Sequence, residues 1–181
     1  MRKNGFTLIE LLITFVILGI ATSIAIPGFA RWLPDSRLKS AARDLYSSMQ
    51  LARLGAIKSN ADWAIVFNAG SNSYRVCSDD GGDDDWKDGN EAVEKTVTLT
   101  DYGSGVTYGP GNAANPIGTT FGGDNISYTP DNPSVAVFNS RGTGSGGYVY
   151  LENNKNTATY GVGTRTSGII RLLKWNGASW E

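Results

Sequence analysis

The chain has 181 residues and nearly balanced charge, with 16 Lys and Arg against 17 Asp and Glu. It contains no histidine, which excludes Ser-His-Asp and Cys-His catalysis and histidine-bound zinc. Cys77 is the only cysteine, so an internal disulfide and a multi-cysteine metal cage are also excluded. We expect Cys77 to be a small apolar strand residue and the chain to be neither an enzyme nor a cofactor protein.

The N-terminal segment contains an apolar run over residues 6–26, preceded by Arg2 and Lys3. At 1.5 Å per helical residue the run spans roughly 30 Å, the thickness of a bilayer core. Because basic residues stay on the cytoplasmic side, we expect the N-terminus to be cytoplasmic. The chain after the apolar run should then lie on the opposite side of the membrane. The sole charge of the run is Glu10, and an unpaired carboxylate there would cost roughly 2.5–3.5 kcal/mol. Glu10 therefore predicts a partner.

Two simpler interpretations of this segment stay open. One is a secretory signal peptide cleaved after the small residues Ser23-Ile24-Ala25, which would release a secreted protein. The other is a plain membrane anchor that tolerates Glu10. Neither interpretation gives a role to the Gly5-Phe6 junction.

Residues 3–12, with the sequence KNGFTLIELL, resemble the N-terminal signature of type IV pilins and type II secretion pseudopilins. The resemblance implies that residues 1–5 are a leader peptide, that a prepilin peptidase cuts between Gly5 and Phe6, and that Phe6 is N-methylated. It also implies that Glu10 pairs with the terminal amine of a neighbouring subunit as the helix leaves the bilayer for a filament. Such pairing offsets the desolvation of both charges.

Residues 27–60 predict a continuation of the N-terminal helix. Pro27 and Pro34 each predict a kink or a local break, because proline removes a backbone donor and clashes with the preceding turn. From Leu38 onward, apolar residues recur at steps of four and three, which predicts one helical face packed on a sheet. The stripe consists of Leu38, Ala42, Leu45, Met49, Ala52 and Ala56.

Residues 61–181 predict a β-rich domain on the periplasmic side. Seven short runs are rich in β-branched and aromatic residues and are separated by Gly, Asn and Asp clusters. Residues 103–125 are glycine-rich and predict a loop. The fold class is therefore α+β, a long N-terminal helix packed on one mostly antiparallel sheet. The seven predicted strands are 63–67, 74–77, 95–99, 134–138, 147–151, 157–162 and 168–175.

Three further segments narrow the resemblance to the GspH/FimT family of minor pseudopilins and minor pilins. They are residues 51–58 (LARLGAIK), 138–142 (FNSRG) and 167–171 (SGIIR). The resemblance implies a minor pseudopilin in the inner membrane, at or near the tip of a type II secretion pseudopilus, with other pseudopilins and the prepilin peptidase as partners. The alternative is a minor pilin that primes a type IV pilus.

DNA binding is a further expectation, because some FimT-type pilins capture DNA through a cationic C-terminal strand and loop. The first arginine of their Gly-Arg-x-Arg motif is Ile169 here, which leaves Arg165, Arg171 and Lys174 as candidate contacts. Cleavage after Gly5 would leave 14 basic and 17 acidic residues. A net acidic domain disfavours DNA binding, since affinity depends on neutralised phosphates.

An aspartate-rich segment at residues 79–89 raises the possibility of Ca²⁺, which takes carboxylate oxygens and which the major pseudopilins, as relatives, bind in a C-terminal loop. The spacing does not fit an EF-hand, because Lys87 would occupy a liganding position. A solvated acidic loop is therefore favoured over a Ca²⁺ site. The candidate ligands are Asp79, Asp80, Asp83, Asp84, Asp85 and Asp88.

Overall fold

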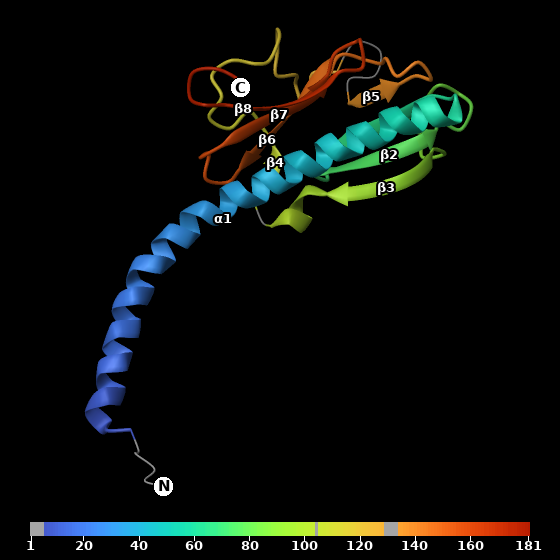
Figure 1. Cartoon of the computed structure of the whole chain (residues 1–181). Helices are drawn as coiled ribbons and strands as arrows, with labels where there is room; N and C mark the ends of the chain where they lie inside the picture. The colour runs from blue at the N-terminus through green and yellow to red at the C-terminus, as the bar shows by residue number, and fades with distance from the viewer. Residues whose placement is uncertain (1–5, 104, 129–133) are drawn as a thin grey trace. The chain divides into compact units, whose positions relative to one another are not determined.

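The computed structural model describes residues 6–103, 105–128 and 134–181, except the side chain of Arg31 (Figure 1). The chain divides into two compact units, Met1–Leu33 and Pro34–Glu181. One α-helix, α1 (Leu8–Ser59), contributes its first half to the first unit and its second half to the other.

The N-terminal unit is helical from Leu8 onward, and its large apolar side chains from Phe6 to Trp32 are exposed. α1 is long and apolar enough to cross a membrane, by length and composition. Its first turn begins with a capping box, in which the Glu10 N–H donates to Thr7 Oγ1 at 3.3 Å and the Thr7 N–H donates to Glu10 Oε2 at 3.4 Å. The unit thus exposes the apolar surface that a bilayer or a neighbouring protein would cover.

The two helix prolines do not interrupt α1. Pro27 and Pro34 both lie within the continuous helical segment, so the expected local break is found at neither position. Bending at these residues stays a prediction. The helix ends at Ser59, because Asn60 takes a left-handed conformation with φ of 52°. The next N–H, from Ala61, returns to the Ala56 carbonyl, as is common at helix C-termini.

The C-terminal unit contains two four-stranded antiparallel sheets, where one was expected. The predicted α+β class, a long N-terminal helix packed on antiparallel strands, is confirmed. The first has the strand order β3-β2-β1-β5 and the second β4-β6-β7-β8. All seven predicted strands form, with ends shifted by a few residues. The bounds are β1 Trp63–Asn68, β2 Ser73–Asp79, β3 Ala92–Thr98, β4 Val106–Tyr108, β5 Val135–Phe138, β6 Gly147–Asn153, β7 Thr159–Thr164 and β8 Ile170–Lys174.

The second sheet was missed because strand patterning does not say which strands pair, and because β4 was predicted to be loop. β4 has only three residues, too few for a periodic signal, and a short 3₁₀ helix at Leu99–Tyr102 leads into it. The remainder of the predicted loop forms a cover over the second sheet. There Ile117 and Phe121 pack with Tyr150, and the Ile117 N–H donates to the Tyr150 hydroxyl at 2.8 Å.

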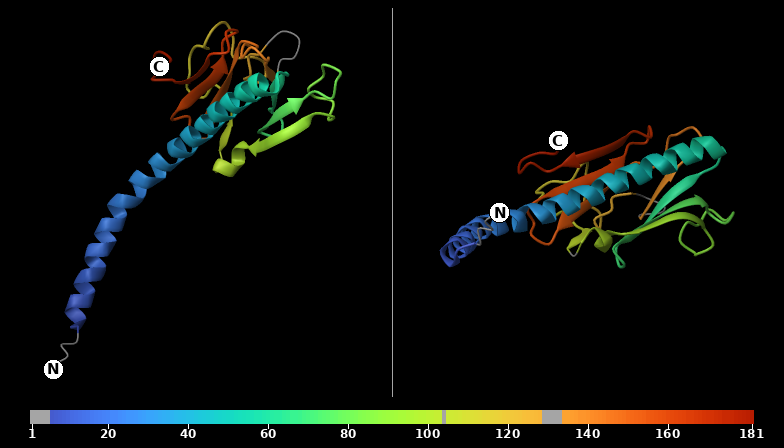
Figure 2. Two further views of the ribbon diagram at one scale, coloured as in Figure 1. Left: turned by 45° about the vertical axis from the view of Figure 1, so that its right-hand side comes forward. Right: turned by 60° about the horizontal axis from the view of Figure 1, so that its bottom comes forward.

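The main hydrophobic core lies between the second half of α1 and both sheets (Figures 1 and 2). All six residues of the predicted stripe have no exposed surface, which confirms that face of the helix. They pack in one cluster with Ile65 and Val76 of the first sheet and Val149 and Val162 of the second. The compact unit begins at Pro34, since this half of the helix belongs to its core.

Two carboxylates tie α1 to the sheets. Asp44 accepts hydrogen bonds from Lys95 Nζ at 2.9 Å and from the Tyr74 hydroxyl at 2.8 Å, which attaches the helix to the first sheet. Asp35 accepts from Asn153 Nδ2 at 2.8 Å and so reaches the second sheet. Burial raises the pKa of Asp44, but the hydrogen bonds, first among them that of Lys95, outweigh burial and hold the pKa below its ordinary value.

Candidate functional site

The predicted processing junction lies at the start of the chain. Gly5 falls outside the described residues. Phe6 precedes the helix, and 84% of its side chain is exposed. A peptide bond ahead of a helix is more accessible to a peptidase than one inside it, because helical backbone groups are engaged in hydrogen bonds.

Glu10 occupies the first turn of α1 and is exposed. Its carboxylate has one described set of partners, the backbone N–H and hydroxyl of Thr7, both at 3.4 Å. These are weak, long contacts, so the carboxylate keeps most of its capacity for a stronger cationic partner. Sequence reasoning missed the local role of Thr7, although Thr followed three residues later by Glu is the recognised pattern of a capping box.

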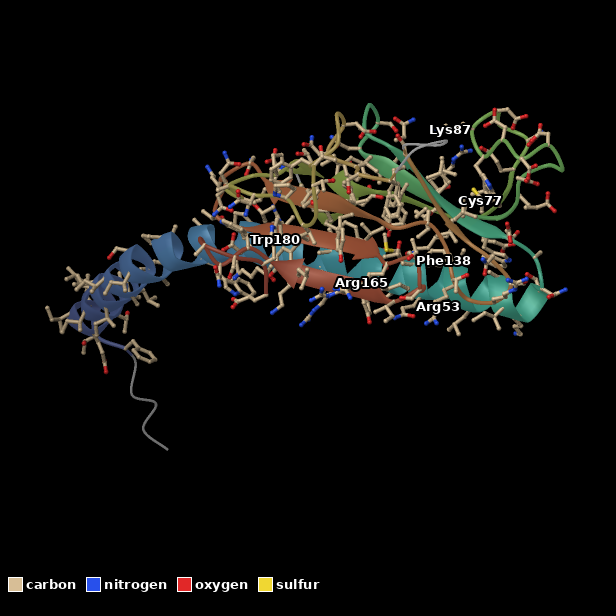
Figure 3. The ribbon with its side chains drawn as sticks, turned by 90° about the horizontal axis from the view of Figure 1, so that it is seen from above. Arg53, Cys77, Lys87, Phe138, Arg165 and Trp180 are labelled. Atoms are coloured by element: carbon tan, nitrogen blue, oxygen red, sulfur yellow. The ribbon has the colours of Figure 1, made fainter. Side chains whose placement is uncertain are left out.

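The three weaker motifs of the sequence meet at one junction in the C-terminal unit. Arg53 Nε, from α1, donates to the Gly142 carbonyl at 2.8 Å. Gly168 packs so closely on this carbonyl that a Cβ there would lie within 2 Å of the oxygen. Phe138, at the end of β5, is fully buried in the core beside them (Figure 3). The motif residues thus join the end of α1 to the turns before β6 and before β8.

One of the three cations proposed for DNA binding, Lys174, lies on a different face of the second sheet from Arg171. β8 is an edge strand, and its side chains alternate between the two faces of the sheet. Arg171 shares a face with Leu173, whereas Lys174 shares the opposite face with Leu172, which packs on the main core. Arg165 lies exposed in the turn between β7 and β8 (Figure 3). The structure therefore separates Lys174 from Arg171, and DNA binding at these residues stays a prediction.

The aspartate-rich loop after β2 uses its carboxylates to hold its own backbone. Asp79 accepts from the Gly81 N–H at 2.7 Å, and Asp83 accepts from the Asp85 N–H at 3.0 Å. The backbone N–H of Asp85 lowers the pKa of Asp83, followed by a hydrogen bond from Asn90. Similar local bonds are made by Asp80, Asp85 and Asp88.

No group of three or more His, Cys, Asp or Glu side chains within the described residues is arranged to hold a metal ion. The hydrogen bonds of these carboxylates go mainly to backbone N–H groups of the loop itself. Ca²⁺ binding at this loop stays a prediction that the geometry does not favour.

The acidic loop is anchored on the first sheet by a residue that sequence reasoning missed. Trp86 is only 5% exposed and packs in a cluster with Ala64, Val66 and Cys77. A lone aromatic residue among aspartates was the available signal. Cys77 is itself fully buried in β2, as predicted, and desolvation raises the pKa of its thiol to about 11.

Comparison with known proteins agrees with the N-terminal and C-terminal motifs. The prokaryotic N-terminal methylation motif matches residues 1–26. No curated protein matches the chain significantly. Among solved structures, the minor pseudopilin EpsH from the type 2 secretion system of Vibrio cholerae is similar at 16% identity and a TM-score of 0.51, covering 76% of this chain and 96% of EpsH. This likeness shows the fold.

The family described as type II transport protein GspH matches residues 41–168, which is more than half of the chain. The match contains the motifs at residues 51–58 and 138–142 and ends at Gly168, within the third motif. Together with the methylation motif, this match identifies a membrane-anchored subunit with an apolar N-terminal helix and a structural role. The chain belongs to the GspH family and is a GspH-type pseudopilin.

Proposed function

We propose that this chain is a minor pseudopilin that is built into a type II secretion pseudopilus at or near its tip. It is made as a precursor, cut by a prepilin peptidase between Gly5 and Phe6, and methylated on Phe6. It is then held in the inner membrane with the C-terminal unit in the periplasm. The observation that carries the proposal is the presence, on one chain, of the methylation motif at residues 1–26 and the GspH match at residues 41–168.

Assembly relies on Glu10 in this proposal. A carboxylate one turn inside an apolar helix is costly in lipid, and an amine on a neighbouring subunit offsets that cost when both are buried. Cleavage by the prepilin peptidase frees such an amine on each processed subunit; in this chain it is the amine of Phe6. The weak contacts to Thr7 hold the carboxylate in the first turn without satisfying it fully.

The test is the mass of the N-terminal peptide isolated from native membranes. A methylated Phe6 start supports peptidase processing and filament assembly. A start after Ala25 would indicate a secreted β protein and overturn the proposal. An intact N-terminus would leave a plain anchor and would also overturn it.

A minor pilin of a type IV pilus is the runner-up, because both machines use the same kind of anchor and peptidase. Deletion of the gene distinguishes them. Loss of exported proteins from the medium with surface pili intact supports the pseudopilus, whereas loss of pili with export intact supports the type IV machine.

A further inference from the structure

The last turns of α1 expose apolar side chains that the fold of the C-terminal unit does not need. Leu51, Leu54 and Ile57 are 45%, 62% and 45% exposed. A helix on a protein surface normally turns polar residues to solvent. Earlier positions on this same side of α1 within the C-terminal unit follow that rule, since Lys39, Arg43 and Ser47 are exposed there. Within this unit, the exposed apolar surface on this side therefore lies at the end of the helix.

Trp63, the first residue of β1, forms a fixed wall beside these side chains. Its indole lies against Gly55, where a Cβ would fall 2.6 Å from the ring. The indole N–H donates to Ser59 Oγ at 2.9 Å, which sets the orientation of the ring. Because both contacts lie within the folded unit, the wall exists before any partner arrives.

Together these residues line a groove of about 780 Å³, which we name the α1-end groove. Its lining contains one charged residue, Lys58, and no carboxylate. Such a groove suits an apolar occupant, since a charged one would lose its hydration without gaining a partner. The lining residues are Leu51, Leu54, Gly55, Ile57, Lys58, Ser59 and Trp63.

We infer that the α1-end groove receives the apolar N-terminal helix of a neighbouring pilin-like subunit. The inference rests on the proposed function and names the partner surface for it. Residues at positions i, i+3 and i+6 of a helix form a ridge, and ridges of this kind pack into the grooves of another helix. Subunits of this class carry such a helix, as this chain does, with exposed apolar side chains from Leu8 to Trp32.

Both the incoming helix and the α1-end groove have exposed apolar surface that the contact would bury. When such a subunit leaves the bilayer, its apolar helix must be covered by protein, because exposing it to water costs roughly 25 cal/mol per Å². The α1-end groove is a preformed apolar surface outside the main core. A neighbouring helix in this groove covers exposed apolar surface on both partners at once.

The experiment is site-specific photo-crosslinking in cells that carry the complete secretion machine. A photoreactive phenylalanine analogue replaces Leu54 in the full-length chain, and a matched variant carries it at Ser47, an exposed polar position on the same side of α1. We expect crosslinks from position 54 to the apolar N-terminal helix of another pilin-like subunit, located by peptide mass spectrometry, and few from position 47. Crosslinks from position 54 to lipid or to a secreted protein would overturn the inference, as would their absence from incorporated subunits.

A second variant keeps this test separate from the proposed function. Leu54→Glu places a charge in the α1-end groove and should reduce incorporation into filaments about tenfold, because the charge must be desolvated. Ser47→Glu should assemble normally. Since Leu54 is exposed, both variants should melt near wild type. If Leu54→Glu is processed at Phe6 and assembles like wild type, the groove inference fails while the proposed function stands; if wild type is neither processed nor incorporated, the proposed function itself has failed.

Discussion

The two halves of α1 expose their apolar residues to different surroundings. In the first half nearly every large apolar side chain is exposed. In the second half an apolar stripe is fully buried against two sheets. The first half of the helix thus presents apolar surface to a partner outside the chain, whereas the second half buries its apolar stripe in the core of its own C-terminal unit. This difference predicts that substitutions in the first half affect assembly, whereas substitutions in the second half affect the stability of the C-terminal unit.

The largest expected effect is on processing. Gly5→Val should leave an uncut precursor, because a branched side chain at the scissile position obstructs a peptidase that accepts glycine. Asn4→Ala is the control and should be cut normally. The N-terminal peptide mass reports both variants. Normal cutting of the Gly5→Val precursor would disprove the assigned junction.

The next effect distinguishes the two halves by stability. Leu45→Ala should lower the free energy of unfolding of the C-terminal unit by about 2–5 kcal/mol, because a fully buried leucine leaves a cavity. Leu12→Ala, in the exposed half, should leave this transition unchanged. Thermal unfolding followed by circular dichroism measures both. A Leu45→Ala unit as stable as wild type would contradict the packing of this half.

Glu10→Val should be cut and methylated normally yet enter filaments about tenfold less, because the apolar helix still inserts in lipid while the charge pairing is lost. Thr7→Val is the matched control, since it removes the capping hydroxyl and keeps the carboxylate. Incorporation is measured on sheared filaments. If Thr7→Val fails to the same degree, loss of the cap rather than of pairing explains the defect.

The tether at Asp44 gives a smaller, pH-dependent effect. Its pKa is lower in the folded protein than in the unfolded chain, so its contribution is fully present above the unfolded pKa of about 3.9 and is lost as the pH falls through the folded value. Asp44→Asn should therefore be less stable than wild type at pH 7, and the gap should narrow in acid below about pH 4. Asp62→Asn, at an exposed position, is the control. A gap that is constant with pH would exclude the tether as its cause.

The smallest effect concerns DNA. Any retardation of DNA by the C-terminal unit at low salt should be weak, and Arg171→Ala should weaken it further and reduce the salt slope by about one. Lys174→Ala, on the other face of β8, should act independently of Arg171→Ala. An electrophoretic shift at two salt concentrations measures this. Complete absence of retardation by wild type would dismiss the DNA expectation.

Much of this fold could be predicted from local patterns. The stripe from Leu38 to Ala56 was found because helical periodicity reports directly which face is buried. β4 was not found because three residues carry no period, and the second sheet was not found because strand pairing depends on contacts distant in the sequence. At the candidate site, Gly5, Phe6 and Glu10 came from one compact signature. Neither the role of Arg53 nor the shape of the α1-end groove could be predicted, since each joins segments that only folding brings together.

The burial of Cys77 has a consequence for the reactivity of its thiol. With a pKa of about 11, on the order of one thiol in ten thousand is ionised at pH 7, and the side chain has no exposed surface. Subunits crowded side by side in a filament would otherwise be at risk of covalent dimerisation through surface thiols. We therefore expect the folded chain to be inert toward thiol reagents, so that a single cysteine introduced at its surface would be the sole site for labelling or crosslinking.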